Sequence, residues 1–226
     1  LNLIGDFGGG GMLLALGIVS ALLETKSSGE GQVIDAAMTD GSSLLMTMMY
    51  SMQQSGFWNL ERQTNLLDGA AHFYDTYECK DGKYISIGSI EPQFYDLLCE
   101  KAELSPDQFG DQMKRDAWKE KKDLISKVFL TKSRDEWCDL MEGTDVCFAP
   151  VLDMSEAPRH PHNIARKTFI ELEGVTQPAP APRFNRTENE VSLPPALAGE
   201  HSKEILESLG LNEEESRSLL ESGAVA

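Results

Sequence analysis

A run of four glycines near the start of the chain opens an uncharged, apolar segment and limits how this region can fold. The run follows an acid in Gly5-Asp6-Phe7-Gly8-Gly9-Gly10-Gly11-Met12, and no charged residue occurs from Phe7 to Leu23. Glycine has no Cβ, so its backbone can come very close to a ligand or a neighbouring element. Amides at a helix start also favour negative charge. The segment therefore predicts a helix over Phe7 to Leu23 with an acid at its start.

Asp6 has two local interpretations. As an N-cap, its carboxylate would bond the free amides of the first turn, and the glycines would serve only close packing. As a chemical group, it would lie beside a ligand bound at the same amides. A phosphate-binding loop fits poorly, because the stretch lacks the Gly-Lys-Ser/Thr ending and the Asp6 carboxylate repels phosphate. The local sequence leaves the first two interpretations open.

The uncharged run is too short to predict a membrane span. It has seventeen residues, five of them glycines, between Asp6 and Glu24. A spanning helix needs about twenty apolar residues. We expect a buried helix instead, and no membrane span.

Composition and net charge limit the classes of molecule that this chain is expected to bind. The 226 residues are 41% hydrophobic, enough for one large domain or two small ones with a real core. With 37 acidic and 20 basic residues the net charge is −17, which opposes nucleic-acid binding, so we expect a small molecule or another subunit as partner. Because the sequence starts at Leu1, we expect a later part of a longer protein, with any targeting signal and most phosphate-holding groups upstream.

Cysteine and histidine patterns indicate no metal site. The four cysteines lack C-x-x-C spacing and predict reduced thiols: Cys79, Cys99, Cys138 and Cys147. We therefore expect a cytoplasmic protein, or a mitochondrial or peroxisomal one if the source is eukaryotic. His160 and His162 flank Pro161 in a polar stretch that predicts a solvated turn.

The first part of the chain predicts an α/β layer. Gln32 to Met38 has the composition of a short, mostly buried strand. A second helix is expected to start at Asp40 or Ser42 and to carry an apolar, core-filling stripe: Leu44, Leu45, Met48, Met49 and Met52. Helix, strand and helix in succession are typical of an α/β fold.

An α+β module follows a connection at Gly56 to Asp68. Phe73 to Cys79 and Lys83 to Ile87 predict a hairpin with an Asp81-Gly82 turn. Helices are expected in three places, and an extended segment after them: from Pro92, Ala117 to Leu130, Ser133 to Met141, and Pro150-Val151-Leu152.

The last part of the chain predicts a return to the first domain. Five of the ten prolines lie between Gly174 and Ala198, which indicates an extended connection. Two amphipathic helices follow, Ser202 to Leu209 and one that Asn212 begins with a capping box. We therefore predict four parts: a large-domain segment at 1–55, a linker at 56–68, a small α+β domain at 69–165, and a return with C-terminal helices at 166–226.

Motifs from several of these parts resemble one known family. Three of them are similar to those of α-methylacyl-CoA racemases in the family III CoA-transferase superfamily: Gly5-Asp6-Phe7-Gly8-Gly9-Gly10, Gly31-Gln32-Val33-Ile34-Asp35 and Ile90-Glu91-Pro92-Gln93-Phe94-Tyr95. Shorter motifs extend the resemblance through the small module: Leu67-Asp68-Gly69, Gly143-Thr144-Asp145 and Pro150-Val151-Leu152. The likeness runs from the first residue to at least Phe169.

The resemblance implies a fold and a reaction. The implied fold is α/β, with part of a large Rossmann-like domain, an inserted smaller α+β domain, and two interlocked subunits that share each active site. The implied reaction racemises the α-carbon of a 2-methyl-branched acyl-CoA through an enolate, which needs two acid/base groups and nearby hydrogen-bond donors. Coenzyme A is then part of the substrate, and no separate cofactor is implied.

The resemblance also assigns roles to Asp6 and Glu91. The family pairs a histidine with an aspartate, and the aspartate falls on Asp6. Helix-start amides favour the ionised acid, whereas burial by Phe7 and the ligand would favour the neutral one. Glu91 matches the family's second acid, which pairs with the histidine; judged locally, it is a helix-start carboxylate.

The catalytic histidine of the family has no counterpart in this chain. None of the histidines lies in its motif: His72, His160, His162 and His201. We therefore expect that histidine and most groups that contact CoA upstream of Leu1, and expect residues 1–226 alone to be inactive.

Two other functions stay open. A CoA-transferase of the same superfamily would use Asp6 as a nucleophile and carry the acyl group as a mixed anhydride. Such transferases tend to have a glycine-rich loop where this chain has Ser89-Ile90-Glu91-Pro92, so the racemase is preferred. A non-catalytic acyl-CoA-binding homologue is the third candidate. The sequence does not determine which acyl chain is preferred.

Overall fold

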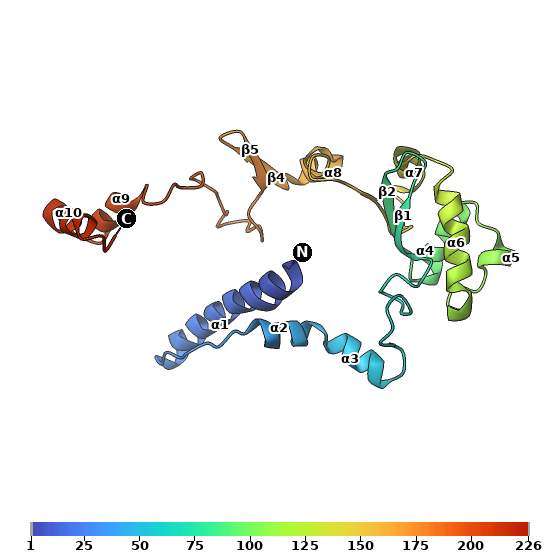
Figure 1. Cartoon of the computed structure of the whole chain (residues 1–226), viewed down its shortest axis with the longest axis horizontal. Helices are drawn as coiled ribbons and strands as arrows, with labels where there is room; N and C mark the ends of the chain where they lie inside the picture. Colours follow the sequence, from blue (N-terminus) through green and yellow to red (C-terminus); the bar gives the residue numbers. More distant parts are fainter. Residues whose placement is uncertain (1, 226) are drawn as a thin grey trace. The chain divides into compact units, whose positions relative to one another are not determined.

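The computed structural model describes residues 2–225 and divides the chain into two compact units, Leu1–Val151 and Leu152–Ala226 (Figure 1). The first unit contains η1 (Leu3–Met12), α1 (Leu13–Ser28), α2 (Met38–Leu45), α3 (Thr47–Gln54), β1 (Tyr74–Glu78), β2 (Tyr84–Gly88), α4 (Pro92–Lys101), α5 (Pro106–Phe109), η2 (Arg115–Ala117), α6 (Trp118–Phe129), α7 (Arg134–Met141) and β3 (Phe148–Val151). The second contains η3 (Ala157–Arg159), α8 (Pro161–Arg166), β4 (Phe169–Leu172), β5 (Val175–Pro178), α9 (Ser202–Ser208) and α10 (Glu213–Glu221). The four-part division expected from the sequence stays a prediction.

The first helix begins before Asp6. η1 and α1 are continuous, and η1 is wound as a π-helix, a rare form that often occurs at functional sites. Asn2 is the N-cap residue and makes no side-chain cap bond, whereas Asp6 lies inside the helix. The predicted helix start and the N-cap interpretation of Asp6 are therefore wrong, because the apolar Leu3 and Ile4 extend the helix by a turn.

The glycines of η1 pack directly against α2. Gly9, Gly10 and Gly41 are buried, and a Cβ on Gly41 would lie 1.8 Å from the Gly9 carbonyl oxygen. A Cβ on Gly10 would lie 3.0 Å from Met38 Cγ. We call Gly9 and Gly10 of η1 with Met38 and Gly41 of α2 the glycine seam. It confirms that the glycine run has a close-packing role, since no side chain fits between the two backbones.

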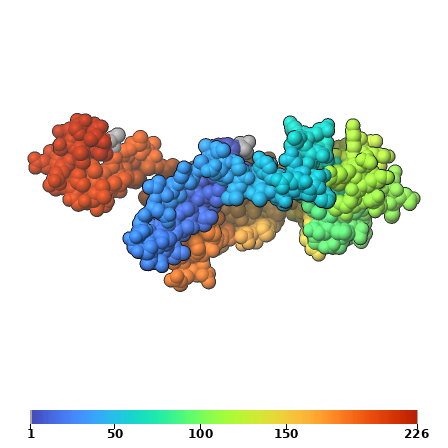
Figure 2. Space-filling view, turned by 90° about the horizontal axis from the view of Figure 1, so that it is seen from below, coloured from blue at the N-terminus to red at the C-terminus, as the bar shows by residue number. Residues whose placement is uncertain are grey.

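The helix is longer and more exposed than the sequence suggested. It runs for 26 residues from Leu3 to Ser28, and by length and composition it could cross a membrane. Little of it is buried in the part of the chain that the structure describes, and Leu16 and Val19 are more than half exposed. Figure 2 shows this blue segment at the molecular surface. The expectation of a buried helix is thus wrong within residues 2–225, whereas the expectation of no membrane span stays a prediction.

The predicted strand at Gln32 to Met38 does not form. The segment is irregular, and Val33 is 96% exposed. A strand requires hydrogen bonds from a neighbour, and no strand among residues 2–225 pairs with this segment. α2 then begins at Met38 rather than at Asp40 or Ser42, and its apolar stripe is not the expected core, because Leu44, Leu45 and Met48 are exposed.

The predicted α+β module forms around an antiparallel sheet of order β1-β2-β3. Tyr74 pairs with Gly88 and Glu78 with Tyr84, which confirms the hairpin at Asp81-Gly82. The predicted helices are present as α4, α6 and α7, and the predicted extended segment forms β3. The fully buried side chains of the core come from both strands and helices: Phe73, Ile85, Leu98, Ile125, Phe129, Trp137 and Met141.

The second unit holds four elements that the sequence did not predict: η3, α8, β4 and β5. β4 and β5 form an antiparallel hairpin, with positive φ at both turn residues, Glu173 and Gly174. α8 includes His162, which is exposed as expected but helical, so the prediction of a turn is wrong at that residue. The irregular proline-rich stretch and α9 agree with expectation, and the Asn212 capping box of α10 is confirmed.

Candidate active site

Asp6 lies exposed on the first turn of the long helix. Its backbone amide donates to the Asn2 carbonyl over 3.1 Å. Its carboxylate makes no hydrogen bond or ion pair within residues 2–225. Phe7 is 60% exposed and does not bury it, contrary to expectation. The acid is thus free to meet a ligand at the helix end where amides lack intrahelical acceptors.

Glu91 begins α4 without using its side chain as a cap. The backbone carbonyl of Glu91 accepts the amides of Phe94, at 3.1 Å, and Tyr95, at 3.0 Å. The carboxylate makes no cap bond and is exposed. Because the local helix-start role is filled by the backbone, the carboxylate stays available for another partner.

An open pocket of about 700 Å³ lies beside the peptide that leads to Glu91. Its lining comes from the linker, the three strands and the residue before β3, and includes Leu67, Asp68, Gly69, Tyr74, Asp75, Gly88 and Cys147. Gly88 donates its amide to the Cys147 carbonyl over 2.9 Å. Burial raises the pKa of the Cys147 thiol, and the negative charge of Glu91 raises it further. The Glu91 charge thus acts on Cys147, which lines the pocket, although Glu91 itself is not part of the lining.

Two polar contacts fix the linker side of the pocket. Asn65 is buried and donates its amide and its side-chain nitrogen to the two carboxylate oxygens of Asp68, each over 2.8 Å. Burial raises the pKa of Asp68, but the hydrogen bonds from Asn65 and from the Thr64 and Ala70 amides together hold this pKa below the usual range. Lys122 of α6 contacts both the Asp75 carboxylate and the Gly69 carbonyl. Sequence reasoning missed both residues. No local pattern reports the Lys122 contacts, which span about fifty residues, whereas Asn65 and Asp68 are only three residues apart and their spacing was a usable local signal.

His72 cannot serve as an acid or base for a ligand. It is fully buried, with Nε2 2.7 Å from the Tyr95 hydroxyl. Burial, and then the charge of Lys121, lowers the pKa of His72 to about 3, so the ring is neutral at physiological pH. The described residues contain no group of three or more side chains suited to a metal ion.

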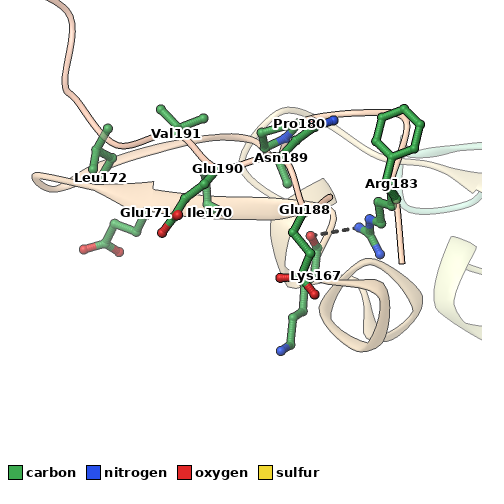
Figure 3. A pocket seen from close by; sticks show the side chains of 12 residues that line it. Lys167, Ile170, Glu171, Leu172, Pro180, Arg183, Glu188, Asn189, Glu190 and Val191 are labelled. Atoms are coloured by element: carbon green, nitrogen blue, oxygen red, sulfur yellow. Dashed lines mark hydrogen bonds between the residues drawn. The ribbon is translucent and has the colours of Figure 1, made fainter. Parts of the chain in front are cut away.

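The second unit has a pocket of its own. It measures about 600 Å³ and lies between the β4–β5 hairpin and the proline-rich stretch (Figure 3). Arg183 donates to the Lys167 carbonyl over 3.0 Å, and apolar and charged side chains of both signs alternate around it. This pocket contains neither Asp6 nor Glu91, so it is not the candidate active site.

Asp6 and Glu91 lie on separate elements, and no hydrogen bond or ion pair joins their side chains in residues 2–225. Each contributes a free carboxylate, and neither is among the residues that line the pocket of the small module, although Gly88 of that lining lies three residues before Glu91. The two elements supply two carboxylates, and His72, the histidine of the same unit, is too buried to act with them. A histidine from elsewhere would complete a proton-transfer pair.

The sequence matches CoA-transferase family III over residues 2–202, and the chain therefore belongs to that family. It is 43% identical over 220 residues to mouse α-methylacyl-CoA racemase, covering 95% of this chain and 57% of the relative. The human α-methylacyl-CoA racemase is 42% identical over 217 residues, with the same coverage. The chain thus spans a little over half the length of these relatives.

Solved structures show the same fold. A CaiB/BaiF family protein from Brucella suis superposes with a TM-score of 0.69 at 19% sequence identity, over 89% of this chain and 54% of that one. The predicted α/β fold class and the resemblance to the family III superfamily are confirmed.

Proposed function

We propose that the protein is an isomerase that racemises the α-carbon of 2-methyl-branched acyl-CoA thioesters. The observation that carries the proposal is the 43% identity to an α-methylacyl-CoA racemase over 95% of this chain. Two unpaired carboxylates, Asp6 and Glu91, support it because they occupy the positions that the resemblance assigns to acids. The cofactor requirement is limited to the coenzyme A of the substrate.

The proposed reaction moves one proton at a time. A base takes the α-proton from one face of the thioester, and the electrons of the C–H bond shift onto the carbonyl oxygen to form an enolate. A proton from the opposite face then restores the C–H bond with inverted configuration. Asp6 acts on one face, and free amides of the first turn of η1 are suited to hold the enolate oxygen.

The second acid/base group is a histidine outside residues 1–226. One observation supports this part of the proposal. His72, the histidine of the unit that carries Asp6 and Glu91, is fully buried. Glu91 pairs with that histidine and orients it. Residues 1–226 alone are then inactive, and most groups that contact CoA lie outside them.

Two interlocked copies of the protein form the proposed assembly. The resemblance to the family carries this proposal. The apolar surface of α1 is open within residues 2–225, and the remainder of the protein or a second copy can cover it. A second copy would cover that surface and place the small module of one subunit at the active site of the other.

Replacing Asp6 by asparagine in the full-length protein tests the proposal. We expect Asp6→Asn to abolish exchange of the α-proton of a 2-methylacyl-CoA with heavy water, because the amide cannot accept a proton, while the dimer stays intact in light scattering. Asp40→Asn, at an exposed acid of α2, is the matched control. Normal exchange in Asp6→Asn would contradict the role of Asp6.

A CoA-transferase is the second candidate, because the family carries that name. In a transferase, the Asp6 carboxylate would attack the thioester carbonyl, release CoA as the thiol and hold the acyl group as an anhydride. Hydroxylamine would convert that anhydride to a hydroxamate with a mass change at Asp6. Trapping at Asp6 would favour the transferase, and no trapping with rapid α-proton exchange favours the racemase. If the full-length protein binds acyl-CoA and shows neither, it is a non-catalytic homologue.

A further inference from the structure

The peptide that leads to Glu91 is held by a buried side chain from a distant part of the small module. Gln112 lies between α5 and η2 and is 9% exposed. Its side-chain nitrogen donates to the Ser89 carbonyl and to the Ile90 carbonyl, each over 2.9 Å. These carbonyls belong to the two residues directly before Glu91.

The chemistry of this contact fits a primary amide. The two hydrogens on the Gln112 nitrogen match two carbonyl acceptors, whereas a glutamate or methionine of the same length has no such pair of donors. The backbone of Gln112 is fixed in turn, because its carbonyl accepts a hydrogen bond from Trp118 Nε1 over 2.8 Å. Since Trp118 is itself a buried core residue, the amide is anchored to the core of the module.

Ser89 makes other hydrogen bonds besides the one from Gln112, whereas Gln112 is the donor that bonds the Ile90 carbonyl. The Ser89 hydroxyl donates to the Val146 carbonyl over 2.5 Å, and the Ser89 amide donates to the Phe73 carbonyl over 3.0 Å. On Ile90, the amide donates to the Gly88 carbonyl over 2.9 Å, which closes a tight three-residue turn. Without the Gln112 bond, the Ile90 carbonyl loses its partner in this turn, and the peptide that joins it to Glu91 gains rotational freedom.

We propose that Gln112 is a positioning residue that sets the place of the Glu91 carboxylate through the Ser89 and Ile90 carbonyls. The inference rests on the proposed function, in which Glu91 orients the catalytic histidine. It adds a residue that touches neither substrate nor histidine yet controls proton transfer. A shift of about 1 Å in such a group can lower a rate by about 100-fold.

Gln112→Met in the full-length protein removes both donors while keeping the length of the side chain. We expect α-proton exchange to fall by roughly 10- to 100-fold with little change in the Kd for acyl-CoA. Gln108→Met, at an exposed glutamine of α5, is the control and is expected to behave as the unaltered protein. In Gln112→Glu, exchange should recover partly as the pH falls, because a protonated carboxyl regains one donor. Unaltered exchange in a folded Gln112→Met protein would overturn the proposal.

A second measurement does not depend on activity. The charge of Glu91 helps to raise the pKa of the exposed Cys147 thiol, so Glu91→Gln should speed its alkylation by iodoacetamide near neutral pH. If Gln112 positions Glu91, Gln112→Met should speed it too, and Gln108→Met should not. An unchanged rate in Gln112→Met overturns the positioning role. Faster alkylation in that variant, together with no α-proton exchange in the unaltered protein, would sustain the positioning and overturn the racemase.

Discussion

The buried His72 makes the stability of the small module depend on pH. The Tyr95 hydroxyl has one hydrogen and donates it to the Phe109 carbonyl over 2.8 Å. His72 Nε2 must therefore carry the hydrogen of the 2.7 Å contact with Tyr95, and Nδ1 is the unprotonated nitrogen. Nδ1 is buried without a hydrogen-bond partner in the part of the chain described. Protonation would thus create an unbonded buried donor close to the positive charge of Lys121.

The size and sign of this change in the free energy of unfolding follow from the pKa of His72. Burial lowers the pKa of His72 from 6.5 in the unfolded chain to about 3 in the folded state. Between these values the unfolded chain binds the extra proton, so the free energy of unfolding decreases as the pH falls from about 6.5 to about 3. At pH 5 the free energy of unfolding is lower by about 2 kcal/mol. This value is the 1.5 pH units between pH 5 and the unfolded pKa of 6.5, multiplied by about 1.4 kcal/mol per pH unit.

The substitution His72→Gln removes the titration and keeps a donor for the Tyr95 hydroxyl. We expect the unaltered protein to lose about 2 kcal/mol more than His72→Gln between about pH 8 and about pH 5. Urea unfolding followed by the fluorescence of Trp118 and Trp137 measures both, since the two indoles are buried in the same core. His162→Gln, at an exposed histidine, is the control. Parallel losses in the unaltered protein and His72→Gln would refute the assignment.

Two further predictions concern packing and capping. Gly41→Ala should destabilise the protein by about 1–3 kcal/mol, because its Cβ would meet the Gly9 carbonyl. Gly11→Ala should not destabilise it, since its Cβ would make only an ordinary contact with the Asp6 carbonyl, 3.8 Å away. Equal thermal unfolding of the two variants would contradict the packing role of the glycine seam. Ser133→Ala should cost about 1 kcal/mol in urea unfolding, because it breaks the capping box with Glu136. An unchanged midpoint would show that the cap contributes nothing.

The sequence predicted best where short-range chemistry decides the structure. Asp81-Gly82 fixes a hairpin because glycine accepts the positive φ of the turn, here +75°. Proline at 92 starts α4, since its ring presets the helical backbone. Asn212 and Glu215 cap each other at the start of α10. In each case the determining contacts join residues within a few positions of one another.

The sequence predictions were wrong where the structure depends on residues far apart in the chain or on an unusual turn residue. Gln32 to Met38 has strand composition, but a strand also needs a neighbour to pair with. The β4–β5 hairpin was missed because its turn uses Glu173, an unusual residue at positive φ, rather than asparagine or aspartate. A local signal was nevertheless present, since Gly174 separates two short runs rich in branched and aromatic residues.

In the candidate site, too, the sequence predicted the residues that lie in local motifs and missed the residue whose contacts are distant. Asp6 and Glu91 came from motifs, and the structure leaves both carboxylates unpaired within residues 2–225. Their roles stay predictions. Gln112 could not be found from the sequence, because its two acceptors are backbone carbonyls 22 and 23 residues away. Backbone acceptors leave no residue-type signature, so only coordinates reveal such a contact.

The direct meeting of backbones at Gly9 and Gly41 also constrains motion. A contact between side chains can deform as rotamers change, but two touching main chains have nothing soft between them. Any rearrangement that carries the Asp6 turn toward a bound ligand must therefore carry α2 along with it. An opening and closing step at this site would appear as a joint displacement of the two helices, with little change at their mutual contact.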